Sequence, residues 1–329
     1  MFLDASKAFD RVKHSILFTK LLNRGAPKYI VRILMYWYSH QNMCVRWGGV
    51  ISSTFKVSNG VRQGGILSPY LFNVYMDDLS NNLNVSNYGC ISGSRLVNHL
   101  MYADDLVLIC PSAVGLAELI LICERYGVEH DIKYNPKKSA VMICRNKCIK
   151  DVKFAPFTLS GECINEVSHI KYLGHFLCDD TKDDKDIIRQ CRQMYAQGNM
   201  LVRKFHMCNV NTKVYLFRTY CSSFYTSQLW WNYNKSSIRK LAVAYNNVFR
   251  MLLKLKKDCS ASNMFAQNYV KSCSAVIRNL VFKFMKRLEN SSNKIVLSVL
   301  NSEMRWRSRI RCHWLKLLYV QPAYSFMVP

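Results

Sequence analysis

Apolar residues recur at two different spacings along the chain, and the change in spacing divides it into two parts. Up to about Cys178, short runs that alternate apolar and polar residues indicate strands, interleaved with segments at helical spacing. Beyond that residue nearly every segment has the spacing of a helix. The polar segment "DDTKDDKD", residues 179–186, is expected to be a hinge between them. The pattern therefore predicts an α+β first part and a mostly helical second part.

Individual elements of the first part can be predicted from the same pattern. Helices are expected at Ile16–Leu22, Ile30–Tyr38, Ser68–Leu79 and Gly115–Tyr126. Ser68 is expected to cap its helix, with Pro69 in the first helical position. Hairpins are predicted for "MCVRWGG" with "VISSTFKVS", for "LVNHLMYA" with "LVLICP", and around a turn at Ser160–Gly161. The first residues, "MFLD", are expected to form a strand too short to be a secure central strand.

The net charge of +25 is unevenly distributed along the chain. After Asp186 there are 24 Lys and Arg residues against three acidic ones (Asp258, Glu289 and Glu303), so +21 of the charge lies in the last 143 residues. A surface made basic only for solubility would mix both signs. The one-sided excess instead indicates a polyanionic partner with a phosphate backbone.

The cysteine pattern and the hydropathy exclude several classes of protein. The fourteen cysteines include no CxxC pair and no Cys/His quartet at zinc spacing, so reduced thiols of an intracellular protein are expected. No uncharged apolar run reaches the roughly 18 to 20 residues of a membrane span. Asp4, Lys7 and Asp10 are unlike the residues of a signal peptide.

The stretch "HLMYADDLVLI" places two adjacent aspartates, Asp104 and Asp105, in an otherwise apolar segment. Neighbouring ionised carboxylates repel, and their burial is costly unless a cation compensates. This pair is expected at a hairpin tip, and Asp4 at the end of a strand. If the two strands are neighbours in one sheet, the three carboxylates converge as hard oxygen ligands that select Mg²⁺. Two such ions about 3.5–4 Å apart can activate a 3′-hydroxyl and stabilise a leaving pyrophosphate.

Five motifs in chain order resemble the palm motifs of reverse transcriptases: "FLDASKAFDRV", "GVRQGGILSPYLF", "YADDLVLI", "NPKKS" and "HIKYLGHFL". The residues of these motifs are similar to those of non-long-terminal-repeat (LINE-type) retrotransposons. The later "LAVAYNNVFRMLL", "CSASNMF" and "FMKRLENSSN" resemble the region after the polymerase in such elements. A YADD alone recurs by chance, whereas five motifs in order are a specific signal. The resemblance implies an RNA-directed DNA polymerase with two Mg²⁺ ions as cofactor, for which Mn²⁺ can substitute.

The resemblance also implies catalytic residues. Asp4 and Asp104 would bind both metal ions, with Asp105 as the third carboxylate. Lys138 matches the lysine of the "NxxKS" pattern, where a cation could neutralise or protonate the leaving group. Lys137 is an alternative phosphate contact at the neighbouring position.

Further residues are implied to contact the substrates. Phe9 would crowd the sugar 2′ position and so select deoxynucleotides, although an ordinary core aromatic is the alternative interpretation. Gln63 and Gly64 would line the incoming nucleotide and the template, and Tyr102 would lie near the primer end. The turn that grips the primer strand would be formed by Tyr172, Leu173 and Gly174.

The domain organisation expected from the pattern and the resemblance has three parts. Residues 1–180 would form a reverse transcriptase palm, 181–255 a helical thumb-like region, and 256–329 a basic helical C-terminal extension. Reverse transcriptases of this kind carry a fingers region upstream, so an N-terminally truncated enzyme lacking most of the fingers is expected. The partners would be an RNA template, a DNA primer or target, and deoxynucleoside triphosphates, with no membrane, in the nucleus and cytoplasm. The alternative is a catalytically inactive retroelement remnant that at most binds nucleic acid.

Other acidic residues are given structural interpretations. Asp10 is expected to stabilise a local turn, and Asp77–Asp78 to lie on a solvated helix face. The doublets Asp179–Asp180 and Asp183–Asp184 are assigned to the hinge.

The basic half contains two segments that mix cations with aromatic residues. In "FRTYCSSFYTSQLWWNYNKSSIRK" the Lys and Arg side chains, and not Trp230 and Trp231, are expected to face nucleic acid. The run from Arg305 to Lys316 could be either a nucleic-acid contact or a solvated helix face.

Overall fold

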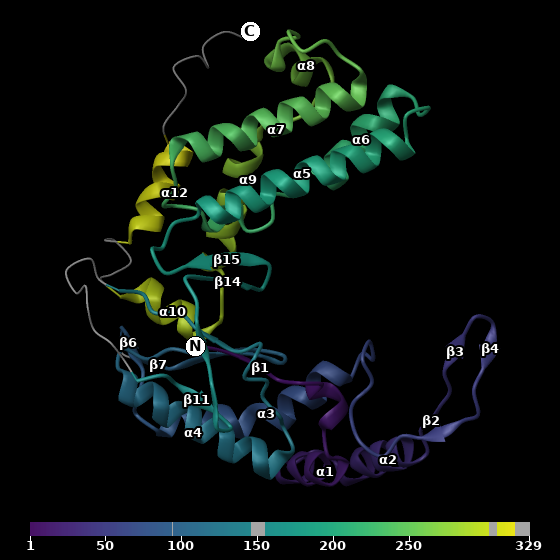
Figure 1. Cartoon of the computed structure of the whole chain (residues 1–329), viewed down its shortest axis with the longest axis vertical. Coiled ribbons are helices and arrows are strands. Elements are labelled where there is room, and N and C mark those ends of the chain that lie inside the picture. The colour runs from purple at the N-terminus through teal and green to yellow at the C-terminus, as the bar shows by residue number, and fades with distance from the viewer. Residues whose placement is uncertain (94, 146–154, 303–307, 320–329) are drawn as a thin grey trace. The chain divides into compact units, whose positions relative to one another are not determined.

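The computed structural model describes residues 1–93, 95–145, 155–302 and 308–319. Internal contacts divide the chain into two units, residues 1–142 with 149–167, and residues 143–148 with 168–329. The first unit mixes strands and helices, and the second is mostly helical (Figure 1). This confirms the predicted α+β class. None of the described helices has the length and apolar character to cross a bilayer.

The described residues of the first unit form the helices α1 (His14–Asn23), α2 (Lys28–Ser39), α3 (Ser68–Val85) and α4 (Ala113–His130) and the 3-10 helix η1 (Ala8–Arg11). Its strands are β1 (Phe2–Asp4), β2 (Asn42–Met43), β3 (Arg46–Trp47), β4 (Val50–Ile51), β5 (Phe55–Lys56), β6 (Cys90–Ser92), β7 (Arg95–Val97), β8 (His99–Tyr102), β9 (Asp105–Leu108), β10 (Ala140–Val141), β11 (Thr158–Leu159), β12 (Glu162–Cys163) and β13 (Asn165–Glu166). The four predicted helices are all present, each longer than its prediction.

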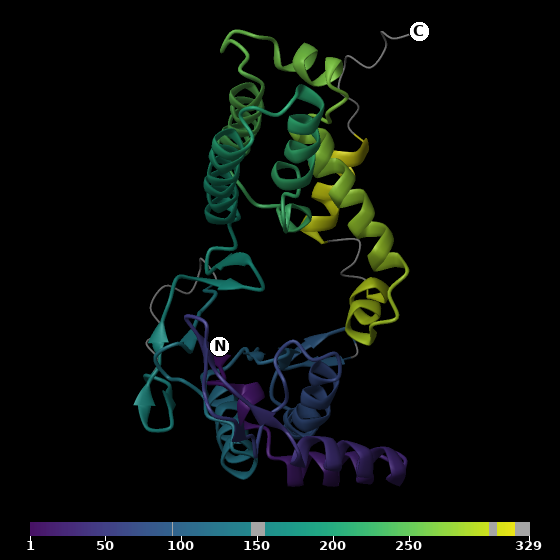
Figure 2. The ribbon, with the colours of Figure 1, turned by 90° about the vertical axis from the view of Figure 1, so that its right-hand side faces the viewer.

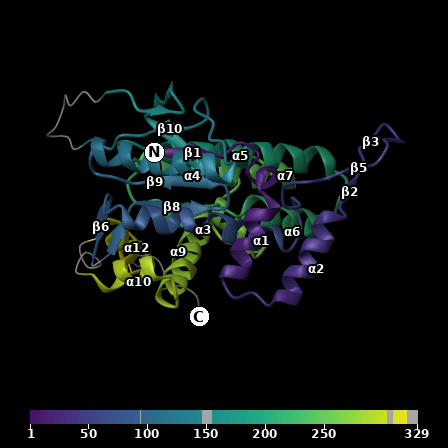
Figure 3. The same cartoon turned by 90° about the horizontal axis from the view of Figure 1, so that it is seen from below.

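A five-stranded sheet in the order β13-β10-β1-β9-β8 forms the centre of the first unit. Figure 3 shows β10, β1, β9 and β8 side by side. β1 pairs antiparallel with both β9 and β10. Leu3 on β1 and Leu106 on β9 are directly opposite each other and buried. The expectation that β1 is too short for a central strand is therefore wrong.

The helix α3 lies between α1 and α4 and carries the apolar stripe predicted for it. Leu71, Tyr75 and Leu79 are buried. The capping prediction is wrong, because Leu67 occupies the capping position and Ser68 is the first helical residue. The Ser68 hydroxyl donates to the Arg62 carbonyl. The side chain of Leu67 makes no capping hydrogen bond.

The acidic pair on α3 is exposed, as expected, and it also joins α3 to α1. The Asp77 carboxylate lies 2.5 Å from the Arg24 guanidinium, and the Asp78 carboxylate lies 2.6 Å from Lys20 Nζ. Lys20 is buried, and its ammonium also donates to the Tyr126 hydroxyl at 2.8 Å.

The hairpins predicted for "MCVRWGG" with "VISSTFKVS" and for "LVNHLMYA" with "LVLICP" are both present. β3 pairs with β4 and β2 with β5, so that residues 42–56 extend as one hairpin beyond the end of α2 (Figure 1). β8 pairs with β9 through a two-residue turn at Ala103–Asp104. β11 and β12 pair around Ser160–Gly161, as predicted.

The described residues of the second unit form a hairpin and a set of helices. The hairpin consists of β14 (His169–Tyr172) and β15 (His175–Cys178). The helices are α5 (Asp184–Lys204), α6 (Val210–Cys221), η2 (Ser227–Leu229), α7 (Lys235–Leu253), α8 (Ala261–Gln267), α9 (Cys273–Glu289), α10 (Lys294–Asn301) and α12 (Arg309–Tyr319).

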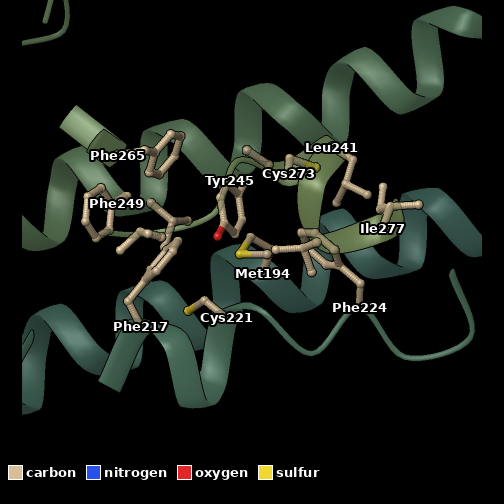
Figure 4. Packing of buried hydrophobic residues seen from close by; sticks show 14 of the residues in the cluster. Met194, Phe217, Cys221, Phe224, Leu241, Tyr245, Phe249, Phe265, Cys273 and Ile277 are labelled. Carbon is tan, nitrogen blue, oxygen red and sulfur yellow. The ribbon is translucent and has the colours of Figure 1, made fainter. Parts of the chain in front are cut away.

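Helices α5, α6, α7 and α9 enclose the core of the second unit (Figures 1 and 2). Its aromatic and sulfur-containing side chains interdigitate around Tyr245, which is fully buried (Figure 4). Gly198 on α5 permits close approach of α7, because a Cβ there would lie 2.5 Å from Val248 Cγ1. Trp230, which is expected not to face nucleic acid, is buried in this core.

The prediction that residues 179–186 form a polar hinge is wrong for the second half of this segment. Asp183 and Asp186 are buried, and α5 begins at Asp184. Asp183 accepts hydrogen bonds from the backbone N–H groups of Trp231 and Asn232, each at 2.8 Å. These carboxylates therefore fix the loop before α7 to the start of α5.

Candidate active site

The pairing of β1 with β9 brings two of the three predicted carboxylates together. Asp4 is directly opposite Asp105, and Asp105 is in turn opposite Tyr102 on β8. Directly opposed residues on antiparallel strands point to the same face with Cβ atoms about 4.5–5.5 Å apart. Asp104 follows Ala103, whose φ of 54° is left-handed, in the turn that joins β8 to β9.

Negative charge is concentrated at this edge of the sheet. Partial burial raises the pKa of Asp105, and the negative charges of Asp104 and Asp4 raise it further. Asp104 and Asp4 are thus both close enough to Asp105 to repel its carboxylate. A bound cation would relieve this repulsion.

The segment around "NPKKS" holds the backbone of Asp4 from the other side. The Asp4 N–H donates to Ser139 Oγ at 3.1 Å, and the Asn135 N–H donates to the Asp4 carbonyl at 2.8 Å. Ser139 is buried. Sequence reasoning missed the positioning role of both residues, although each belongs to the "NxxKS" pattern that was noted for its lysine.

Lys137 and Lys138 are both exposed in the turn that Asn135 organises. The Lys137 N–H donates to Asn135 Oδ1 at 3.0 Å, and the Lys138 N–H donates to the Asn135 carbonyl at 3.2 Å. Both ammonium groups are therefore available to a ligand. The choice of Lys138 over Lys137 stays a prediction.

Phe9 lies on η1 and stacks on Phe72 of α3, with ring centroids 4.5 Å apart and an angle of 8° between the planes. It is half-buried, which is compatible with either interpretation of this ring. The Phe9 carbonyl accepts a hydrogen bond from the Val61 N–H at 2.8 Å. This bond ties η1 to the loop that carries Gln63 and Gly64.

Gln63 and Gly64 are exposed in that loop, and Gly64 has a left-handed φ of 81°. Nothing lies within 4 Å of a Cβ built on Gly64, so the protein's own atoms leave this position open. Gln63 Nε2 is 3.5 Å from Asp10 Oδ1. Gln63 and Asp10 line a cavity of about 770 Å³, together with the cations Lys56 and Arg62.

The predicted primer-grip residues belong to the second unit. Leu173 and Gly174 form the turn between β14 and β15 and both have left-handed φ angles, 45° and 82°. The Tyr225 hydroxyl donates to the Leu173 carbonyl at 3.0 Å. A Cβ on Gly174 would lie 2.7 Å from Tyr225 Cε1, so the ring requires glycine here. The role of Tyr172, Leu173 and Gly174 stays a prediction.

The chemistry of the carboxylates is suited to a hard cation. Among the described residues, no group of three or more His, Cys, Asp or Glu side chains could hold a metal ion by itself. Mg²⁺ is commonly held by one or two carboxylates together with substrate phosphates, which a closed protein cage would exclude. The opposed pair of Asp4 and Asp105, with Asp104 in the adjoining turn, supplies oxygen ligands of this type.

Comparison with known proteins gives consistent matches. Residues 1–177 match the model of the family described as reverse transcriptase (RNA-dependent DNA polymerase). The Pol polyprotein of the type-1 retrotransposable element R2 from Nasonia vitripennis is 30% identical over 179 residues, which are 52% of this chain and 17% of that protein. The Pol polyprotein of the type-2 element R2DM from Drosophila melanogaster is 38% identical over 118 residues, 36% of this chain and 11% of the relative.

The similarity extends into the helical unit in another relative. The RNA-directed DNA polymerase from mobile element jockey of Drosophila funebris is 24% identical over 305 residues, 89% of this chain and 32% of the relative. The chain thus spans no more than about a third of the length of any of these three relatives.

Proposed function

The chain belongs to the reverse transcriptase (RNA-dependent DNA polymerase) family, and from this membership we propose that it copies RNA into DNA. Its relatives are retrotransposon proteins such as those of R2 and jockey, so it is a reverse transcriptase of the LINE type. The proposed reaction extends a DNA 3′ end on an RNA template with deoxynucleoside triphosphates.

The antiparallel pairing that sets Asp4 opposite Asp105, beside Asp104, is the observation that carries this proposal. Such a set of carboxylates at one edge of a sheet is what a nucleotidyl-transfer site needs. We propose that Asp4, Asp104 and Asp105 hold two Mg²⁺ ions, with Mn²⁺ as a substitute. When bound, the ions would activate the primer hydroxyl and neutralise the triphosphate.

The chain's own residues would bind and orient the substrates around these carboxylates. Lys138 would place its ammonium against the leaving phosphates. Phe9, held by its stacking on Phe72, would restrict space at the sugar 2′ position. Gln63 and Gly64 would border the template and the incoming nucleotide, and Tyr102 would lie near the primer end.

The wider organisation follows the same proposal. Residues 1–180 would act as the palm, 181–255 as a thumb-like region and 256–329 as a basic extension along nucleic acid. Within this plan the turn at Tyr172, Leu173 and Gly174 would grip the primer. Its rigid geometry, fixed by the bond from Tyr225 to Leu173, supports that role.

Primer extension on an RNA template with Mg²⁺ tests the proposal. The comparison is between the wild type, Asp104→Asn, and the matched control Asp77→Asn, whose carboxylate is exposed on α3 and pairs with Arg24. We expect extension by the wild type and the control, and a loss of at least about 100-fold in Asp104→Asn. Equal extension by all three proteins would refute the assignment.

Mn²⁺ binding followed by electron paramagnetic resonance provides a second readout that does not require catalysis. Asp104→Asn should weaken the binding of Mn²⁺, and Asp77→Asn should leave it unchanged. If Asp104→Asn bound Mn²⁺ as tightly as the wild type, the proposal that Asp104 holds a metal ion would be refuted.

The charge distribution favours a second candidate function, nucleic-acid binding without catalysis. The excess of +21 in the last 143 residues is sufficient for salt-sensitive association with a phosphate backbone. Salt-dependent RNA binding by a wild type that extends no primer, under conditions in which an active reverse transcriptase does, would support this alternative.

A further inference from the structure

A pocket of about 630 Å³ in the helical unit, outside the proposed active site, is lined by residues of η2, α7, α9, α12 and the loop that follows η2. Its volume is in the range of about 300–1,000 Å³ that is usual for small-molecule sites. Buried apolar and aromatic side chains, including Trp230 and Ile277, form part of its wall. Ile277 is seen beside Leu241 and Cys273 at one end of the core in Figure 4.

Three cations surround this apolar wall. Arg239 comes from α7, Arg278 from α9 and Lys316 from α12, and no carboxylate lines the pocket. Within the described part of the chain, none of the three has an ion-pair partner. The pocket therefore combines an apolar interior with unpaired positive charge, which suits an aromatic anion.

A buried hydroxyl in the wall of the pocket makes no hydrogen bond with the described residues. Ser227 lines the pocket and is 1% exposed, and its Oγ makes no hydrogen bond with any described residue. A buried polar group without a partner costs free energy, so such groups are uncommon unless a ligand or water satisfies them. The wall beside it is rigid, because Trp230 Nε1 donates to the Asp186 carboxylate at 2.8 Å.

We propose that this pocket binds one unpaired nucleotide of a nucleic-acid strand. The base would enter against the half-buried ring of Tyr233, its polar edge would bond to Ser227 Oγ, and its phosphates would lie along Arg239, Arg278 and Lys316. Unstacked bases are bound in this way, by aromatic faces and by cations on the backbone. The proposal differs from the expectation that only basic side chains meet nucleic acid. It requires strand binding but not catalysis.

Substitution of Ser227 separates a ligand role from a structural one. Ser227→Ala removes an unpartnered buried hydroxyl, so the melting temperature of the full chain should stay the same or rise. If the hydroxyl bonds to a base, the affinity for a single-stranded 12-nucleotide RNA, measured by fluorescence anisotropy, should fall about fivefold. If Ser227→Ala bound the RNA with unchanged affinity, the proposal would be overturned. It would also be overturned if the variant lost the same affinity for an abasic strand of the same length.

Two further variants test the pocket wall and its charge, each with a matched control. Ala242→Leu places bulk in the pocket, whereas Ala196→Leu makes the same change at an exposed position on α5. Base stacking implies that the normal strand binds about tenfold more tightly than the abasic one. We expect the preference for the normal strand over the abasic strand to be lost in Ala242→Leu and retained in Ala196→Leu. If the two variants showed the same preference, the proposed site would be refuted.

For the charge, Arg278→Gln should lower the salt dependence of binding by about one unit of slope. Lys283→Gln, an exposed charge elsewhere on α9, should leave that slope unchanged. Equal effects of the two variants would show that only the overall charge matters.

A comparison of probes shows whether the pocket binds a nucleotide within a strand or a free nucleotide. RNA and DNA 12-mers are compared with a free nucleoside monophosphate. Tighter binding of either strand supports the proposal, and equally tight binding of the free monophosphate would replace it with a mononucleotide site.

Discussion

Replacement of Asp186 by alanine is expected to release the β14–β15 hairpin from the helices of the second unit. The Asp186 carboxylate is fully buried and accepts hydrogen bonds from the Phe176 N–H at 3.1 Å, Arg189 Nε at 2.7 Å and Trp230 Nε1 at 2.8 Å. His175 Nδ1 lies 3.1 Å from the same carboxylate. One side chain thus joins β15, α5 and the loop after η2.

The size of the effect follows from what the substitution leaves behind. Removal of one partner of a buried ion pair costs about 3–5 kcal/mol, because the remaining charge stays buried without compensation. Here Arg189, whose side chain is 17% exposed, would be left in that state. Since domains are stable by about 5–15 kcal/mol in total, Asp186→Ala should remove a large fraction of the stability of this unit.

Hydrogen exchange measured by mass spectrometry on the full chain reports the change locally. Protection of peptides from β15 and the first half of α5 should fall by about 150-fold, the equivalent of 3 kcal/mol, while peptides from α1 keep theirs. Asp180→Ala is the matched control, because Asp180 is exposed, and its carboxylate only accepts a hydrogen bond from the neighbouring Lys182 N–H at 3.0 Å and lies 3.6 Å from the Lys182 ammonium. Equal loss of protection in the two variants would refute the reasoning.

The same carboxylate predicts a pH dependence. Burial alone would raise the pKa of Asp186, but hydrogen bonds from His175, Arg189 and Trp230 hold the pKa well below its usual range. Its stabilisation is therefore present above the unfolded pKa of about 3.9 and is lost as the pH falls towards the folded value. Thermal melts of the wild type and Asp186→Asn should differ most near pH 7 and converge below about pH 4. A constant difference would contradict the assignment.

Three further substitutions test packing and the support of the carboxylates. Ser139→Ala leaves the Asp4 N–H unpaired at a cost of about 1–3 kcal/mol, and it should reduce primer extension while Ser160→Ala, in an exposed turn, does not. Gly60→Ala, at φ +91° and with its Cβ 2.9 Å from Asp10 Cα, should destabilise the first unit by about 1–3 kcal/mol in urea denaturation. Gly198→Ala gains about 1 kcal/mol of helix propensity but overpacks Val248, so circular dichroism melts should show net destabilisation.

The carboxylates of the proposed site could be predicted from sequence because their signal is local. Asp104 and Asp105 interrupt an apolar strand pair, with Asp104 in the turn and Asp105 at the start of β9. Helical spacing likewise located α1 to α4, since each buries a stripe of apolar residues. The spacing of apolar residues therefore identifies the elements that bury their own apolar side chains.

The buried acids of the second unit could not be predicted in this way. Residues 179–186 have the composition of a solvated linker, and nothing in that segment distinguishes Asp186 from Asp180. The donors that make its burial favourable include Trp230, 44 residues further along the chain. A charged side chain becomes a core residue only when such distant partners are in place.

The failed expectation for β1 has a related physical cause. The length of a strand does not by itself decide how firmly it is held, because β1 has three residues and is nevertheless paired on both sides. The pairing also continues past its end, where Ala5 bridges to Tyr134 and the Ser6 N–H donates to the Lys133 carbonyl at 2.8 Å. What positions Asp4 is therefore the number of backbone hydrogen bonds from both neighbours. It follows that the segment from Lys133 to Ala140 controls the geometry of the carboxylates as directly as β1 does, although it contributes none of them.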